Sequence, residues 1–283
     1  MVHAAPIAPP SPEADPLPRN PDAYFTRTGP HCFMPTTHTG GAWSESEQHI
    51  SPMAGLVVHE LEAHATRGED VGANRSLAIS RLSVDILGVL PVDEFGVHVE
   101  VLRPGRSIEL LEATVTSGGR PAVRARAWRL ATGDTRDVAG GQGPALPDPE
   151  TLKPWPMTSL WPGGYIASLD VRALTPPEPG RATAWVHTPL QLVDAEPSSD
   201  LARFIALVDT ANGIAVRHSP QDWMFPNVDL TVHLHRQPTG SWVGLDTTVI
   251  FGPAGHGMTS TVLHDILGPV GQATQTLTLR PLI

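Results

Sequence analysis

The sequence has a single cysteine, Cys32, so no disulfide can form within the chain. Sparse cysteine is typical of a reducing compartment, and we expect a cytoplasmic location. The start of the sequence lacks the basic residues and the apolar run of a secretory signal, and no apolar stretch approaches the roughly 20 residues of a membrane span. We therefore expect a protein that makes no use of a membrane.

Basic side chains are also scarce, with 19 Lys and Arg against 29 Asp and Glu and a formal net charge of −10. This balance excludes an extended nucleic-acid-binding surface, because such a surface needs a surplus of positive charge. An anionic ligand would need a local group of arginines. Proline and glycine, in contrast, are plentiful, with 30 and 26 residues, and they predict many short elements joined by turns.

A chain of 283 residues is long enough for two domains of about 140 residues each. Hydrophobic periodicity predicts the same order of elements twice, a helix followed by antiparallel strands. The expected divisions are an Ala- and Pro-rich disordered arm over residues 1–20, a first unit over 21–131, a linker over 132–157 and a second unit over 158–283. The expected helices cover residues 52–65 and 197–213, and the expected strands cover 78–90, 96–103, 107–117 and 122–131 in the first unit and 181–188, 227–236, 242–251, 257–264 and 270–279 in the second.

The two units also share a short sequence pattern, because LSVDI at residues 82–86 is similar to LTVHL at residues 230–234. A repeated unit of a helix and strands favours an antiparallel sheet wrapped around one long helix. Such a unit has an exposed sheet edge, and pairing two units edge to edge covers that edge. The expected fold class is α+β, with two helix-wrapped antiparallel sheets joined into one.

The helix over residues 197–213 carries the most suggestive acid of the sequence. Its apolar residues recur at helical spacing and predict a buried stripe, and Asp209 lies beside this stripe, shortly before Gly213. This carboxylate is either an ordinary polar residue of the last turn or part of a site. Asn227, which opens the next strand, is either a turn residue or a second site residue. Gln275, on an alternating strand, faces either solvent or the same site.

Six motifs follow one another along the chain. The first unit contains GAWSESEQHISP, RLSVDILGVLP and VLRPGRSIELLEATV, and the second contains LVDTANGI, FPNVDLTVHLHRQPTGSWVGLD and GPVGQATQTL. In this order and spacing the chain resembles the acyl-CoA thioesterases of the double-hotdog type, the thioesterase II-like family, over residues 24–283. The resemblance implies a double-hotdog fold and an enzyme of lipid metabolism that hydrolyses the thioester of a fatty acyl-CoA without a cofactor.

The catalytic set that the resemblance implies is an acid in the helix, a Thr or Asn that opens the next strand, and a glutamine on the last strand. These positions fall on Asp209, Asn227 and Gln275. Asp209 would take a proton from the attacking water, while the two amide side chains hold the water or the carboxylate in line. The sequence departs from the family at Asn227, where the best-known members have Thr, and at residues 49–52, where relatives often have a Gly-rich run.

The substrate needs further contacts at its carbonyl oxygen and at CoA. Backbone N–H groups of residues 51–54, at the start of the first helix, are candidates to hold the carbonyl oxygen. Arg203 and Arg236, together with Arg217, either contact the phosphates of CoA or are ordinary surface arginines. We expect one site per chain, because the first unit repeats neither the acid nor the amide that follows it.

Two other kinds of chemistry are disfavoured. His233 and His235 have the spacing of a two-histidine metal edge, but no nearby cluster of Cys, Asp or Glu completes a site, so we expect a solvated face and no metal. The sequence has no Gly-x-Ser-x-Gly motif, which excludes the usual serine-hydrolase route to thioester cleavage.

The alternative function is a non-hydrolytic acyl-CoA or acyl-chain binding protein, or a hydratase on the hotdog fold, since a fold alone does not fix an activity. A hotdog hydratase would need an Asp and a His close together in the sequence. The nearest histidine to Asp209 is His218, which lies beyond Gly213, so hydrolysis is favoured. Pairing of two chains into a homodimer stays open.

Overall fold

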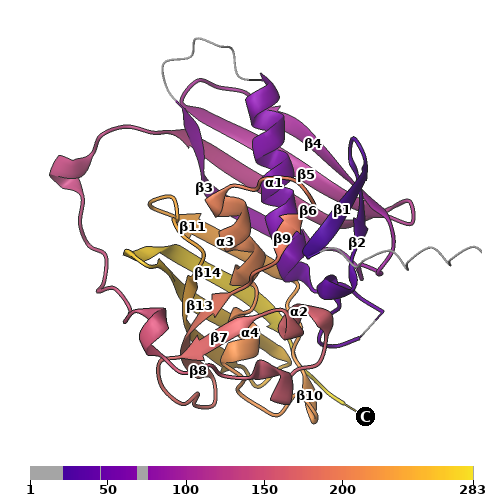
Figure 1. Cartoon of the computed structure of the whole chain (residues 1–283), viewed down its shortest axis with the longest axis vertical. Helices are drawn as coiled ribbons and strands as arrows, with labels where there is room; N and C mark the ends of the chain where they lie inside the picture. Colours follow the sequence, from indigo (N-terminus) through magenta and orange to yellow (C-terminus); the bar gives the residue numbers. More distant parts are fainter. Residues whose placement is uncertain (1–21, 45, 69–75, 283) are drawn as a thin grey trace, which may run out of the picture.

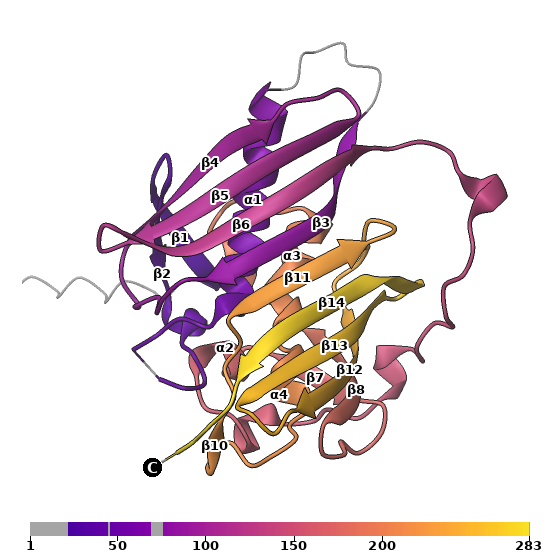
Figure 2. The ribbon, with the colours of Figure 1, turned by 180° about the vertical axis from the view of Figure 1, so that it is seen from behind.

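The computed structural model of the chain describes residues 22–44, 46–68 and 76–282. The arm expected over residues 1–20 lies outside the described residues. The described chain forms one broad, curved sheet, and helices α1 (Ile50–Gly68) and α3 (Asp200–Val208) lie against one face of it (Figure 1). The view from behind shows the strands of the other face, over which no helix of the described residues lies (Figure 2).

Thirteen strands of the described residues make up this sheet. The first half of the chain contributes β1 (Ala23–Gly29), β2 (Cys32–Pro35), β3 (Leu77–Ile86), β4 (Phe95–Arg103), β5 (Ile108–Ser117) and β6 (Arg120–Ala131). The second half contributes β7 (Asp170–Ala173), β8 (Arg181–His187), β9 (Gln191–Val193), β11 (Asp229–Leu234), β12 (Val243–Phe251), β13 (His256–Asp265) and β14 (Gly268–Thr278). The order across the sheet is β7-β8-β12-β13-β14-β11-β3-β6-β5-β4-β2-β1-β9. A separate antiparallel pair joins β10 (Trp223–Met224) to β15 (Arg280–Pro281).

The two halves meet at the antiparallel pair β11–β3, where Val232 lies opposite Leu82 and Leu230 lies opposite Val84. These strands contain the two similar stretches, LSVDI and LTVHL, so the repeated sequence of one half pairs with that of the other where the two halves join. The pairing covers one edge of each half, because backbone groups of both edges hydrogen-bond across it. The expected α+β double hotdog, with two helix-wrapped sheets joined edge to edge, is confirmed.

Helices α1 and α3 approach each other closely at Gly55. A Cβ on Gly55 would lie 2.5 Å from the Cβ of Ala206 and 2.7 Å from the carbonyl oxygen of Ala202, so only glycine fits there. Gly55 is near the start of α1 and Ala206 is near the end of α3, so these two helix ends lie side by side. The apolar stripe expected on α3 is buried and comprises Leu201, Phe204, Ile205 and Val208.

The helix expected over residues 197–213 is interrupted. Helix α3 ends one residue before Asp209, and a short helix α4 (Ala211–Ile214) follows. The hydroxyl of Thr210 donates to the carbonyl oxygen of Leu207 at 2.7 Å, and the backbone N–H of Thr210 donates to the same oxygen at 3.3 Å, so the chain turns tightly where α3 ends. The prediction of one continuous helix was therefore wrong at Asp209, which lies in the break.

The strand expected to open at Asn227 begins two residues later, at Asp229. The amide nitrogen of Asn227 donates to the carbonyl oxygen of Asp229 at 3.0 Å, and such local bonds compete with the sheet ladder. Asn227 keeps an isolated bridge to Leu277 on β14. The same side-chain amide also reaches Asp209 at the end of α3.

The segment expected as a linker over residues 132–157 is irregular apart from the short turns η2 (Arg136–Val138) and η3 (Pro149–Thr151). It runs along the outside of the fold (Figure 2), and the indole N–H of Trp185 donates to the carbonyl oxygen of Pro147 at 2.8 Å. Three further short elements are η1 (Thr37–Thr39), η4 (Met157–Ser159) and α2 (Gly164–Ala167). Among the described residues, no helix is long and apolar enough to cross a membrane.

Candidate active site

The three catalytic positions implied by the sequence meet at the end of α3. Asp209 is buried, with 4% of its surface exposed. Its Oδ1 accepts a hydrogen bond from Nδ2 of Asn227 and another from Nε2 of Gln275, each at 2.7 Å. A helix end, the segment that leads into β11 and the strand β14 thus contribute one side chain each to a single cluster.

The amide of Gln275 is held in one orientation by its other end. The hydroxyl of Thr259, on the neighbouring strand β13, donates to Oε1 of Gln275 at 2.7 Å. Turning the amide over would bring its oxygen against Oδ1 of Asp209, so the NH2 group stays directed at the carboxylate. Gln275 is 2% exposed and does not face solvent. Thr259 could not be recognised from the sequence, because its contact with Gln275 depends on the register of two strands.

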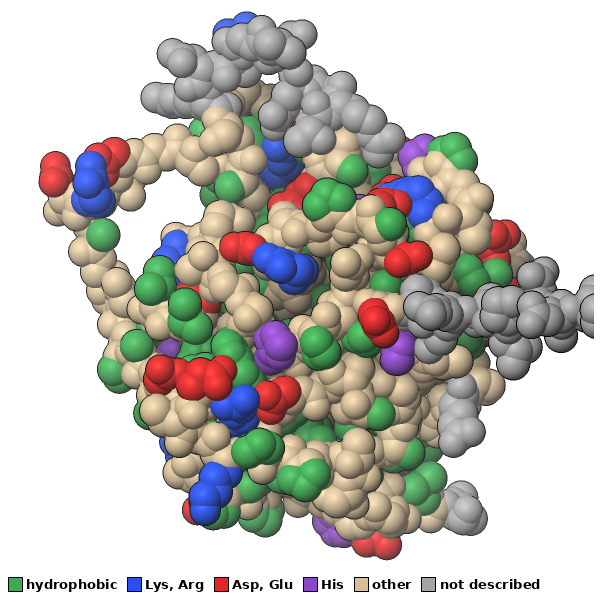
Figure 3. All heavy atoms as spheres, viewed as in Figure 1, with side chains coloured by type: hydrophobic (Ala, Val, Ile, Leu, Met, Phe, Trp, Pro, Cys, Tyr) green, Lys and Arg blue, Asp and Glu red, His purple; other side chains and the backbone are tan. Residues whose placement is uncertain are grey.

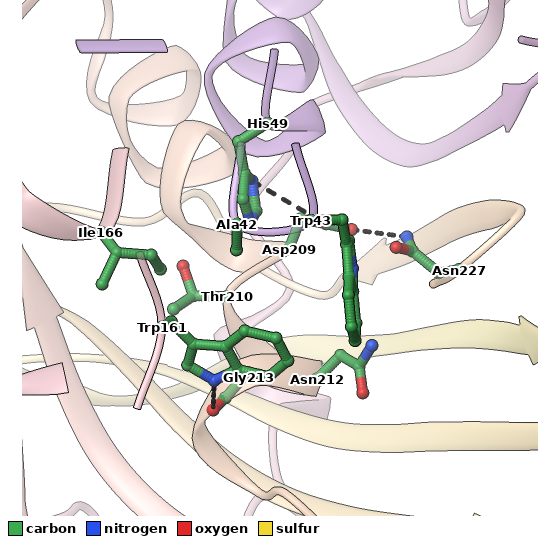
Figure 4. Close-up of a pocket in the computed structure, with 10 residues that line it drawn as sticks. All are labelled: Ala42, Trp43, His49, Trp161, Ile166, Asp209, Thr210, Asn212, Gly213 and Asn227. Carbon is green, nitrogen blue, oxygen red and sulfur yellow. Dashed lines mark hydrogen bonds and ion pairs between the residues drawn. The ribbon is translucent and has the colours of Figure 1, made fainter. Parts of the chain in front are cut away.

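The second oxygen of Asp209 is differently placed. Among the described residues, no group donates a hydrogen bond to Oδ2. Asp209 borders a cavity of about 40 Å³, which is room enough for water. The residues that line this cavity are drawn in Figure 4: Ala42, Trp43, His49, Trp161, Ile166, Asp209, Thr210, Asn212, Gly213 and Asn227.

Burial raises the pKa of Asp209 to about 7. The hydrogen bonds from Gln275 and Asn227 oppose this shift, because they stabilise the ionised carboxylate, while the nearby charge of Asp229 adds to it. A carboxylate with such a pKa is partly ionised near neutral pH. It can accept a proton from water there and can later return it.

His49 also faces this carboxylate, although the sequence marked it only as a departure from the family. Its ring stacks on Tyr165 with centroids 4.2 Å apart, and its Nδ1 lies 4.0 Å from Oδ2 of Asp209. The backbone N–H of Ser51 donates to this Nδ1 at 3.1 Å. That N–H was expected among the donors for a carbonyl oxygen, and the structure shows it occupied by His49 instead.

The imidazole of His49 is uncharged. Burial lowers the pKa of His49 to about 3, so the ring carries one proton at neutral pH. Because Nδ1 accepts the bond from Ser51, the proton is on Nε2. Figure 4 shows the ring pointing into the space that Ala42, Trp161 and Thr210 surround.

Aromatic side chains wall the other side of the cavity. The ring of Trp43 meets Trp161 edge-on at 4.9 Å and Phe225 edge-on at 5.2 Å. The indole N–H of Trp161 is satisfied by the carbonyl oxygen of Gly213 at 2.9 Å. The cavity therefore has an apolar aromatic wall opposite the polar cluster, an arrangement typical of ligand sites. Trp43, like His49, comes from the first half of the chain.

The two arginines predicted to contact CoA lie apart from this cluster. Arg236 forms an ion pair with Asp265, and Arg203 forms one with Asp200. Arg203 lines a second, larger cavity of about 250 Å³ that is separate from Asp209. Figure 3 shows that basic side chains on this face are scattered among acidic ones rather than gathered into a patch.

The described residues contain no group of three or more His, Cys, Asp or Glu placed to hold a metal ion. His233, on β11, and His235, the residue after that strand, are both exposed. The ring Nε2 of His235 is hydrogen-bonded to the carbonyl oxygen of Pro269 at 3.1 Å.

Two family models match the sequence in succession. The model of the acyl-CoA thioesterase N-terminal domain matches residues 39–130, and the model of the acyl-CoA thioesterase C-terminal domain matches residues 149–279. Together they cover well over half of the chain. A search of the curated proteins finds no match.

Solved structures share the fold over nearly the whole chain. A conserved protein of unknown function with a hot dog fold from Alicyclobacillus acidocaldarius has a TM-score of 0.69 at 14% identity, covering 93% of this chain and 98% of that one. The tesB protein of Mycobacterium avium subsp. paratuberculosis has a TM-score of 0.65 at 14% identity, covering 91% and 96%. The acyl-CoA thioesterase II TesB2 of Mycobacterium marinum has a TM-score of 0.60 at 16% identity, also covering 91% and 96%. At these identities the likeness concerns the fold alone.

Proposed function

The chain belongs to the acyl-CoA thioesterase family, a family of thioester hydrolases, and we propose that it hydrolyses an acyl-CoA with Asp209 as the general base. One observation supports this proposal: the two oxygens of Asp209 have different surroundings. Oδ1 accepts both amide donors, and Oδ2 is left for a water molecule in the adjoining cavity. A base that is held at one oxygen and free at the other suits the activation of water.

In the proposed reaction, water hydrogen-bonds to Oδ2 and its oxygen attacks the thioester carbonyl carbon. The proton of the water passes to Asp209, and the π electron pair of the carbonyl moves onto its oxygen. When that pair returns, the carbon–sulfur bond breaks and the thiolate takes the proton from Asp209. The products are a carboxylic acid and the free thiol of CoA, and the proposed reaction uses no cofactor.

Asn227 and Gln275 act as positioning residues in this account. Each donates to Oδ1 at 2.7 Å, so the plane of the carboxylate is fixed while Oδ2 stays directed at the water. Neither amide titrates, so both serve through the whole cycle of protonation. Their donation also opposes the effect of burial on the pKa of Asp209, which stays near neutral pH.

We propose further that the acyl group is a fatty chain and that the larger cavity receives it, which would assign the reaction to lipid metabolism. That cavity of about 250 Å³ has apolar lining from Leu190 and Leu207. Tyr165 lies between the two cavities, because its hydroxyl hydrogen-bonds to Thr210 beside one and to Ala206 beside the other. Entry of the chain would require the hydroxyl of Tyr165 to give up these two hydrogen bonds.

The CoA contacts remain proposals for Arg203 and Arg236. The side chain of Arg203 is 50% exposed and lines the larger cavity, whereas that of Arg236 is 32% exposed and pairs with the buried Asp265. Arg203 is the more exposed of the two, but it lines the cavity assigned above to the acyl chain, so it would contact a phosphate only if that cavity received CoA instead. A phosphate at Arg236 would have to compete with a carboxylate already bound.

A hydratase is the second candidate, because His49 and Asp209 face each other at 4.0 Å although they are distant in the sequence. A hydratase or dehydratase would use the histidine as a base at a carbon next to the carbonyl. The bond from Ser51 to Nδ1 opposes this role, since it leaves the proton on Nε2, the nitrogen directed at the cavity. Hydrolysis therefore has the better support.

One panel of assays separates the candidates. Release of free thiol is measured with saturated acyl-CoAs of short to long chain, and hydration is measured with the matching 2-enoyl-CoAs, for the wild type and Asp209→Asn. We expect thiol release that is lost in Asp209→Asn, with Leu190→Trp shifting the preference towards shorter chains. Hydration without thiol release would favour the hydratase, and binding with neither reaction would favour a non-hydrolytic binding protein.

A further inference from the structure

The hydrolysis proposed above leaves one group without a partner, the negative oxygen that forms when water adds to the thioester. In the usual arrangement, N–H groups aimed at that oxygen stabilise it. His49, the residue before α1, lines the cavity, and the N–H of Ser51 at the start of that helix donates to its Nδ1 at 3.1 Å. The other nitrogen of the same ring, Nε2, has no hydrogen-bond partner among the described residues and is a donor available to the oxyanion.

We propose that His49 is a further catalytic residue of this site, whose Nε2–H donates to the carbonyl oxygen of the thioester and holds the oxyanion. The inference rests on the proposed hydrolysis. It goes beyond the Asp209, Asn227 and Gln275 set, because it assigns a contact to the reacting oxygen from the first half of the chain.

Two contacts hold the ring in the geometry that this role needs. The backbone N–H of Ser51 donates to Nδ1, and Tyr165 stacks on one face with an interplanar angle of 29°. Oδ2 of Asp209 lies 4.0 Å from Nδ1, which places the acid beside the ring. Among the described residues, no group is hydrogen-bonded to Nε2. A carbonyl oxygen in the cavity would be its partner, while the water on Oδ2 approaches the carbonyl carbon from the side of Asp209.

The electrostatic surroundings suit a donor rather than a base. Burial lowers the pKa of His49 to about 3, so Nε2 keeps its single proton at working pH without a net charge on the ring. The N-terminal end of a helix carries a partial positive charge, and α1 begins at Ile50, the residue after His49. The bond from Ser51 passes this polarisation to the ring and favours negative charge beside Nε2.

In this reaction His49 donates a hydrogen bond but neither gains nor loses a proton. As the water oxygen bonds to the carbonyl carbon, the π pair moves to the carbonyl oxygen and the hydrogen bond from Nε2 strengthens. The water proton goes to Oδ2 of Asp209. As the pair returns, the carbon–sulfur bond breaks, the thiolate takes the proton from Asp209, and the bond from Nε2 weakens again.

The test uses thiol release by four full-length variants beside the wild type. His49→Phe keeps a flat ring against Tyr165 but has no N–H, His49→Gln restores an N–H donor, and His98→Phe removes an exposed histidine of β4 as a control. We expect His49→Phe to lower kcat by about 10²–10³ with KM within about threefold, the loss typical of one oxyanion donor. We expect His49→Gln to recover at least about tenfold of that loss, and His98→Phe to match the wild type. Asp209→Asn marks the basal rate.

The outcomes separate the two proposals. A folded His49→Phe variant with kcat within about threefold of the wild type overturns the role of His49 and leaves Asp209 untouched. A wild type that releases no thiol from any acyl-CoA overturns the proposed hydrolysis and the role of His49 with it.

If His49→Phe does not fold, a second measurement tests whether Nε2–H of His49 donates to the oxyanion. In the wild type labelled with ¹⁵N-histidine, a ketone analogue of acyl-CoA that binds as the tetrahedral adduct should shift the Nε2–H signal of His49 strongly. A signal assigned to a proton on Nδ1, or one that the analogue leaves unchanged, contradicts the proposal.

Discussion

Nε2 of Gln275 donates to Oδ1 of Asp209 at 2.7 Å, and the opposite end of the same amide accepts the hydroxyl of Thr259 at 2.7 Å. A side chain from the last long strand is thus locked in one orientation against an acid at a helix end. The orientation matters because an amide that turned over would present an acceptor to a carboxylate. The orientation of this amide therefore depends on a threonine that touches neither the acid nor the cavity.

Thr259→Val removes this anchor with little change of volume. We expect kcat to fall about five- to tenfold and the pKa of Asp209 to rise, because a loosened Gln275 donates less well to the ionised form. The pH dependence of kcat/KM reports the pKa. Thr261→Val is a matched control on the same strand, since Thr261 is equally buried and bonds to Thr247 at 3.0 Å. Equal pH profiles in both variants would refute the role of Thr259.

The rate should depend on the ionisation of Asp209. Burial raises the pKa of Asp209 to about 7, and only the ionised carboxylate can accept the proton of water. We therefore expect kcat/KM to rise with pH and level off above an apparent pKa near 7. A rate already flat from pH 5 upward would mean that Asp209 ionises normally or that another base acts.

Asn227 should tolerate the residue that the resembling family has there. Asn227→Thr keeps a hydroxyl donor for Oδ1 of Asp209, whereas Asn227→Ala removes the bond now made at 2.7 Å. We expect Asn227→Thr to stay within about threefold of the wild type and Asn227→Ala to lose about tenfold in kcat/KM, roughly 1.4 kcal/mol of transition-state stabilisation. The alanine variant should also raise the apparent pKa below which kcat/KM falls, so that the acidic side of the pH profile shifts to higher pH. Equal losses in both variants would argue against donation.

Asp209 should reduce the stability of the protein above neutral pH. Its pKa is raised on folding, from an ordinary value of 3.8 to about 7, so its contribution to stability is fully present below about pH 4 and is lost as the pH rises through about 7. Asp209→Asn has no such dependence. We expect the stability of the variant relative to the wild type to increase by up to ~4 kcal/mol from pH 4 to pH 8, as measured by urea unfolding. A constant difference across this range would show that the acid is not desolvated.

Gly55 should be essential to the contact of the two helices. Gly55→Ala would bring its Cβ within 2.5 Å of the Cβ of Ala206, so α1 and α3 must move apart. We expect a loss of about 1–3 kcal/mol in the free energy of unfolding, the usual effect of overpacking. Gly88→Ala is the control, because a Cβ there meets nothing within 4 Å. Similar stability of the two variants would contradict the close crossing.

The sequence predicted the elements well where apolar periodicity was strong. The buried stripe of α3 and the alternation of β11 reflect local spacing, and the similar stretches of the two halves indicated the duplicated unit. The fold class followed from these features and from the family resemblance. The break at Asp209 was missed, because it depends on the hydroxyl of Thr210 and on its tertiary surroundings rather than on spacing.

The site could be predicted only in part. The resemblance supplied Asp209, Asn227 and Gln275, which the structure brings together. His49 and Thr259 could not be predicted, because their roles arise from a contact between the two halves and from the register of β13 on β14. No local pattern in a single sequence records such long-range pairings.

The most direct test of the account is the rate of thiol release by Asp209→Asn at pH 8, against the wild type with the best acyl-CoA substrate. Asparagine keeps the size of the side chain and an oxygen that can accept both amide donors, so the fold should persist, as a thermal melt would verify. The account predicts a fall in kcat of at least about 10², since the general base is lost. A folded Asp209→Asn variant that retains more than about a tenth of the wild-type rate would contradict the assignment of Asp209 as the base.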